Sequence, residues 1–196
     1  MIDVELDIGL EWSSCGFGQN EVEKAVDAAV KFAGLPGLAD HPSPVEVNIK
    51  LSDNDEVQAL NREWRDKDKP TNVLSFPMLD DDEIQIFRHP REGGGPTPDG
   101  VAITGLEMDS RLRGNDEDMI LLLGDIILAY GVCEAEAAEK AIPLAYHATH
   151  LVIHGMLHLL GHDHIDDGDA EAMEALEVKA LASMGLHNPY SDEIDQ

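Results

Sequence analysis

The chain has 196 residues, 43% of them apolar, and a formal net charge of −27. This length and composition suit a single domain with a proper core and exclude a chain that is disordered throughout. The strong negative charge counts against a general nucleic-acid binder, although residues 62–69 are locally basic through Arg62, Arg65, Lys67 and Lys69.

Four segments have the pattern of β-strands. Residues 2–8 and 45–51 alternate apolar and polar side chains, and residues 72–76 form a third short strand that ends at Pro77. Residues 120–129 are apolar nearly throughout, which is typical of a strand covered on both faces.

Helical spacing follows or separates these strands. We predict helices over residues 20–33, with Asn20 as N-cap, and from Ser52 or Asp53 to 65, where Asp53 and Glu56 have the spacing of a capping box. Three more are expected over residues 133–140, 143–160 and 168–184. The order predicts an α/β (α+β) fold, a small mixed four-stranded sheet packed with about five helices.

Residues 80–118 do not fit this pattern, because they combine a glycine run, eleven acids and four arginines with little periodicity. Such a segment inside a compact domain is usually an insertion or a loop. Two stretches, residues 90–96 and 109–115, resemble peptides encoded by palindromic DNA repeats, which favours an in-frame insertion over a lid loop. We predict one domain over residues 1–196 with a low-order insertion at about 80–118.

The cysteines and the apolar segments indicate the compartment. Cys15 and Cys133 form no CxxC pair and are expected to be reduced thiols. The N-terminus has no basic region before an apolar run, and the most apolar window, residues 119–133, is short and contains Asp125. We therefore expect a cytoplasmic protein without a membrane partner.

Six of the nine histidines lie within eighteen residues, between His147 and His164. His154 and His158 are four apart on an expected helix, so their rings share one face and can share a metal ion. Gly161 is placed to end the helix and let the chain turn back toward His164. Three neutral imidazoles leave a fourth tetrahedral position for water, which predicts a catalytic metal centre at the helical end of the fold.

The other polar residues of this segment leave alternatives open. His147 and His150 are either hydrogen-bonded structural residues or line the site, and His162 is expected to be exposed. Asp163 either orients a ligand histidine or only stabilises a turn. Gly155 stands where zinc proteases carry their general base, so peptide hydrolysis of that kind is not expected.

The segment His154-Gly-x-Leu-His158-Leu-x-Gly161-x-Asp163-His164 resembles the signature of the YbeY family of bacterial endoribonucleases. A second block, Leu60-Asn-x-x-Trp-Arg65-x-Lys-Asp-Lys-Pro-Thr71-Asn-Val-Leu-Ser-Phe-Pro77, is similar to the family's other motif. Gly124-Asp125-Ile126 and His147-x-x-His150 agree in order and spacing. The resemblance covers the chain apart from about residues 80–118.

The resemblance implies one zinc ion per chain, held by His154, His158 and His164, and a functional arginine at Arg65. It also implies cleavage of single-stranded RNA in small-subunit ribosomal RNA 3′-end processing and ribosome quality control, with the ribosome or ribosomal proteins as partners and no DNA. The bound metal would activate water and stabilise phosphoryl charge, and an arginine fork suits a phosphate. Arg65 could instead be only the solvated end of its helix.

Two rival functions remain. One is a zinc hydrolase of another substrate, and the other is a ribosome-associated RNA-binding factor with structural zinc. Two departures from the family pattern matter: His162 replaces the usual tyrosine and offers a fourth nitrogen near the site, and the insertion could shade the cleft or repel RNA.

Overall fold

The computed structural model describes residues 2–39, 41–88, 112–113, 120–164 and 166–190. The elements in chain order are β1 (Asp3–Ile8), the 3-10 helix η1 (Leu10–Ser14), α1 (Gln19–Phe32), α2 (Pro36–Ala39), β2 (Val45–Ser52), α3 (Asn54–Arg65), β3 (Val73–Pro77), α4 (Asp81–Arg88), β4 (Leu112–Arg113), β5 (Ile120–Ala129), α5 (Tyr130–Glu139), α6 (Leu144–Leu159) and α7 (Asp167–Ser183).

The strands form one mixed sheet in the order β1-β2-β5-β3, and the two-residue β4 pairs with β5. β1, β2 and β5 run parallel, whereas β3 is antiparallel to β5, with Phe76 opposite Asp125. In the sequence, helices separate the parallel strands, because the chain must cross back to the same end of the sheet before it can start the next parallel strand. The predicted α/β fold with a small mixed sheet is confirmed.

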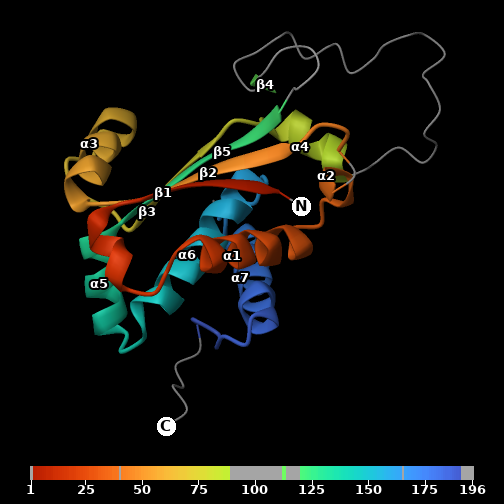
Figure 1. Ribbon diagram of the computed structural model, residues 1–196. Coiled ribbons are helices and arrows are strands. Elements are labelled where there is room, and N and C mark those ends of the chain that lie inside the picture. Colours follow the sequence, from red (N-terminus) through yellow and green to blue (C-terminus); the bar gives the residue numbers. More distant parts are fainter. Residues whose placement is uncertain (1, 40, 89–111, 114–119, 165, 191–196) are drawn as a thin grey trace, which may run out of the picture.

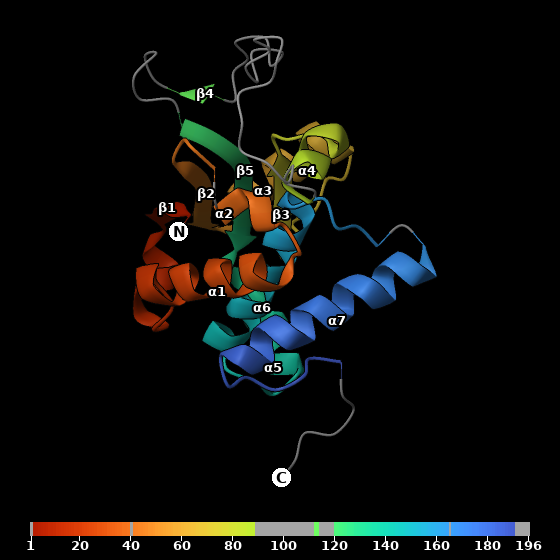
Figure 2. The same cartoon turned by 90° about the vertical axis from the view of Figure 1, so that its right-hand side faces the viewer.

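Helices α1 and α6 cover one face of the sheet, and α7 packs against both of them (Figures 1 and 2). The apolar side chains of these helices form the main core with Leu123, Ile126 and Leu128 of β5. Helix α3 covers part of the opposite face over a smaller cluster of Val57, Leu74 and Ala129. The end of β5 is therefore covered on both faces, as its apolar sequence predicts.

Two details of the helix starts differ from expectation. Helix α1 begins after Gly18, not Asn20, and the Gly18 amide donates to the Glu21 carboxylate at 3.2 Å. Asp53 caps α3 as predicted, accepting from the Glu56 amide at 2.9 Å. The Glu56 carboxylate does not complete a capping box, because Lys50 and Ser52 donate to it instead.

The expectation of a structureless segment from residue 80 is wrong for its first turns. Residues 81–88 form α4, which the Asp80 carboxylate caps at the Glu83 amide, 3.0 Å away, and whose Ile84 and Phe87 are buried. The helical spacing of its apolar residues was not recognised because α4 has only eight residues and begins with three acids. Residues 89–111 and 114–119, where most of the predicted insertion falls, lie outside the described residues, so the insertion stays a prediction.

Among the helices of the described segments, none is long and apolar enough to cross a membrane.

Candidate metal centre

Helix α6 carries two of the three candidate ligands, His154 and His158, and is the most buried of the described helices. Its apolar side chains, from Ala148 to Leu159, pack between the sheet and helices α1 and α7. Gly155 faces the sheet, and a Cβ there would lie 3.0 Å from both Ile126 Cγ2 and Ser75 Oγ. The position that a zinc protease uses for its glutamate is therefore closed by packing.

Gly161 ends α6 in the left-handed conformation, with φ +75°. The His162 amide donates to the Leu157 carbonyl at 2.9 Å, the outer hydrogen bond of a Schellman motif. The predicted helix end at Gly161 is confirmed. The turn sends the chain back along the helix and brings His164, which sits on an exposed loop, next to His154 and His158.

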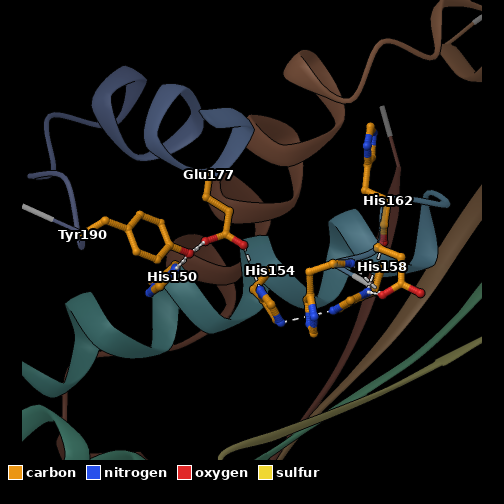
Figure 3. Close-up of polar contacts among 8 residues, drawn as sticks. His150, His154, His158, His162, Glu177 and Tyr190 are labelled. Carbon is orange, nitrogen blue, oxygen red and sulfur yellow. Dashed lines mark hydrogen bonds and ion pairs between the residues drawn. The ribbon is translucent and has the colours of Figure 1, made fainter. Parts of the chain in front are cut away.

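The three imidazoles expected to share a metal are close together. One ring nitrogen from each of His154, His158 and His164 lies within 4.8 Å of the others, and Nε2 of His154 and Nε2 of His158 are 3.1 Å apart (Figure 3). Nitrogens bound to one tetrahedral zinc at 2.0–2.1 Å are about 3.3 Å apart. The first two rings are thus at coordinating separation, and His164 needs a shift of at most about 1.5 Å.

The hydrogen bonds around these rings show that the site suits a cation. Nδ1 of His154 is 2.7 Å from the Glu177 carboxylate, and Nδ1 of His158 is 3.0 Å from the His162 carbonyl oxygen. Both acceptors require a proton on Nδ1, which leaves each Nε2 with a free lone pair. Two lone pairs that face each other at 3.1 Å repel unless a positive charge lies between them, so the donor set fits a metal ion.

The surroundings of His158 and Glu177 favour a neutral imidazole and an ionised carboxylate. Burial, with the rings of His154 and His164 nearby, lowers the pKa of His158 to about 4, so His158 is neutral and able to ligate at pH 7. Burial favours a protonated Glu177, but hydrogen bonds from His150, His154 and Tyr190 outweigh it and lower the Glu177 pKa to about 2.

Arg65 faces the imidazoles across a cleft of about 480 Å³ that both line. It is the last residue of α3, and Asp66 in the left-handed conformation (φ 56°) turns the chain toward β3. Arg65 is exposed and has no ion pair or hydrogen bond to any described residue. The structure thus brings the predicted arginine and the three histidines to one cleft, where Asp81 and Asp163 add negative charge.

Comparison with known proteins gives the same assignment. The family model described as Endoribonuclease YbeY matches residues 11–185. The Endoribonuclease YbeY of Rhizorhabdus wittichii is 46% identical over 191 residues, covering 97% of this chain and 98% of the relative, and that of Sphingopyxis alaskensis is 42% identical over 193 residues, covering 98% and 99%. The chain belongs to the YbeY family.

A solution structure of a Thermotoga maritima protein matches 98% of this chain and 99% of its own length, with 20% identity and a TM-score of 0.49. The sequence relatives alone establish that the chain is a YbeY endoribonuclease by family, an enzyme that acts on RNA.

The remaining histidines of this YbeY chain have distinct partners. His162 is half-buried rather than exposed, because its Nε2 contacts the Ala33 carbonyl oxygen at 3.0 Å, and it is not part of the three-ring cluster. His147 and His150 are both buried; their Nε2 atoms lie 2.7 Å from Glu136 and 2.6 Å from Glu177. His150 thus contacts the same carboxylate, Glu177, as the candidate ligand His154, whereas His147 is paired with Glu136.

The carboxylate within hydrogen-bond distance of a candidate ligand is Glu177, 2.7 Å from Nδ1 of His154, and the sequence analysis did not identify it. Asp163 Oδ1 accepts from the His164 amide at 2.7 Å and lies 4.0 Å from His158 Nδ1, so its geometry is that of a turn. Glu177 had a signal in the sequence, because it interrupts the apolar stripe of α7 that includes Met173, Ala180 and Leu181. A charged residue on a buried stripe needs a buried partner.

Proposed function

We propose that His154, His158 and His164 bind one zinc ion and that this centre cleaves single-stranded RNA during small-subunit ribosomal RNA 3′-end maturation and ribosome quality control in the cytoplasm. Family membership supports RNA as the substrate. The observation that supports the metal is the separation of 3.1 Å between Nε2 of His154 and Nε2 of His158. The ribosome is the partner on which such a substrate is presented.

Zinc is favoured by the donor set. Three neutral imidazoles without thiolates suit zinc better than magnesium or calcium, which prefer oxygen ligands. When bound, zinc supplies Lewis acidity, lowering the pKa of a coordinated water toward neutrality and stabilising charge on a phosphoryl oxygen. A set of three protein ligands keeps the fourth corner open, as a catalytic site needs.

Arg65 is proposed to bind the phosphate that is cleaved. Its guanidinium can donate two parallel hydrogen bonds to phosphate oxygens and stabilise charge that builds up on them. No described residue competes for it. Arg65, at the end of α3, and the three imidazoles line the same cleft, so an RNA strand bound there lies near both.

Charge around the cleft favours a flexible substrate. Asp81 and Asp163 line it, and the chain as a whole carries −27. A single strand can present one phosphate to Arg65 and bend its neighbours away from these carboxylates, whereas a rigid duplex brings several phosphates at fixed spacing. Specificity for single strands follows from this repulsion as well as from the family.

The test is a cleavage assay on protein that has been stripped of metal and then reloaded. We expect zinc to bind in a 1:1 ratio and to restore cutting of an unstructured RNA, with a duplex of the same sequence left intact. A small phosphodiester and a peptide serve as rival substrates. If the protein binds zinc and RNA but does not cleave RNA, the zinc is structural. If it turns over the small phosphodiester or the peptide faster than RNA, it is a zinc hydrolase of that substrate.

A further inference from the structure

Glu177 is a buried carboxylate with both of its oxygens in use (Figure 3). Its side chain is 1% exposed. Oε1 lies 2.7 Å from Nδ1 of His154, and Oε2 lies 2.6 Å from Nε2 of His150. Oε2 also accepts a hydrogen bond from the Tyr190 hydroxyl. Glu177 therefore joins α7, α6 and the segment after α7 at a single point next to the cleft.

We propose that Glu177 is a positioning residue of the metal centre and that Tyr190 and His150 hold it in place. The proposal rests on the metal site proposed above. By accepting from Nδ1, Glu177 fixes the tautomer and the plane of the His154 ring, so that the Nε2 lone pair points at His158. Tyr190 touches no candidate ligand, yet it sets the orientation of the carboxylate that does.

Stability alone does not explain this carboxylate. A buried ion costs several kcal/mol of desolvation, and an apolar side chain of similar volume usually stabilises a core at least as well. Its neighbours on the buried face of α7, such as Met173 and Leu181, are apolar. The three donors around Glu177 remove the penalty without giving a net gain, so a positioning role accounts for its presence.

The arrangement also links the end of the chain to the site. Tyr190 follows α7, and its ring packs edge-on against His150 with centroids 5.7 Å apart. Tyr146 of α6 donates to the His187 carbonyl oxygen and docks the same segment. Docking of residues 187–190 is thus coupled to His154 through the one side chain of Glu177.

Metal affinity tests this coupling. Zinc dissociation constants are measured for apo protein by competition with a chromophoric chelator, and cobalt is loaded in parallel to record the visible absorption of the ligand field. We expect Glu177→Gln to weaken zinc binding about 10- to 100-fold and to alter the cobalt spectrum. Tyr190→Phe should weaken binding less, by a few-fold. Glu171→Gln, the same change at an exposed position of α7, should leave both readouts unchanged.

Urea unfolding of the apo proteins separates positioning from folding. A loss of stability with an unchanged zinc dissociation constant in Glu177→Gln would overturn the inference, and so would an unchanged cobalt spectrum. If Glu177→Gln does not fold, Tyr190→Phe decides, because it keeps the ring and its packing. Absence of zinc binding in the unsubstituted chain would refute the metal centre itself, which is a different result.

Discussion

The two sides of the cleft are built differently. On the α6 side, His154 and His158 stand on a buried helix, and each has an acceptor at 2.7 or 3.0 Å behind its Nδ1. On the α3 side, Arg65 stands at an exposed helix end with no partner among the described residues. Two of the three candidate ligands are held in place by these hydrogen bonds, whereas the Arg65 side chain has no such support.

This difference matches what each side must hold. A metal ion tolerates little variation in distance, so its ligands need rigid support. A phosphate arrives on a flexible polymer, and the long arginine side chain can adapt to it. Substitutions on the α6 side should therefore change metal binding, and substitutions on the α3 side should change turnover alone.

The largest expected effect comes from His158→Ala. It removes a nitrogen at coordinating separation, so the chain should lose stoichiometric zinc and all cleavage above background. Metal analysis of purified protein, alongside the RNA assay, measures both. His41→Ala is the matched control, since the His41 ring lies 3.1 Å from the Ser43 carbonyl oxygen and does not line the cleft. Full zinc occupancy in His158→Ala would remove His158 from the ligand set.

Arg65→Ala should keep one zinc per chain and slow cleavage about 100-fold, because removing one preorganised donor to transition-state charge typically costs 10²- to 10³-fold. Single-turnover rates with metal content measured in parallel test it. Arg62→Ala is the control: Arg62 lies on the same helix, is 3.6 Å from Asp68 and does not line the cleft. Equal losses in the two variants would mean that only the general basic charge matters.

Most helices and strands could be predicted because their apolar residues recur with helical or strand spacing, or, in residues 120–129, follow one another almost without interruption. His154, His158 and His164 could be grouped because Gly161 ends the helix and lets the chain turn back toward the first two rings. Glu177 and Tyr190 could not be paired with His150 and His154, since contacts between α6, α7 and the following segment depend on helix packing rather than on spacing. Helix α4 was hidden for another reason: its apolar face amounts to two or three residues in an acidic stretch.

Gly161→Ala tests whether the helix end holds His164 in place. A Cβ at φ +75° is strained and would lie 3.0 Å from Ile84 Cγ2, so we expect a loss of about 1–2 kcal/mol in unfolding free energy together with weaker zinc binding. Gly16→Ala, between η1 and α1, has the same strain, at φ +74°, with nothing within 4 Å of the new Cβ. It should lose stability but not zinc affinity, and equal zinc affinity in both variants would show that His164 does not depend on this turn.

The smallest effect concerns His147, which shares α6 with the ligands but not the cleft. Burial lowers its pKa from 6.5 despite the opposing effect of Glu136, and its Nδ1 has no partner among the described residues. The unfolded chain then binds a proton more readily than the folded one, so His147 makes stability fall as pH drops below 6.5 toward the lower folded pKa.

His147→Gln keeps a donor for Glu136 but cannot titrate. Urea midpoints of the apo proteins at pH 7.5 and 5.5 should therefore differ less in the variant than in the unsubstituted chain. His158 and His162, whose pKa values are also lowered by burial, contribute equally to both proteins and cancel in the comparison. An unchanged pH dependence would mean that the pKa of His147 is the same in the folded and the unfolded chain.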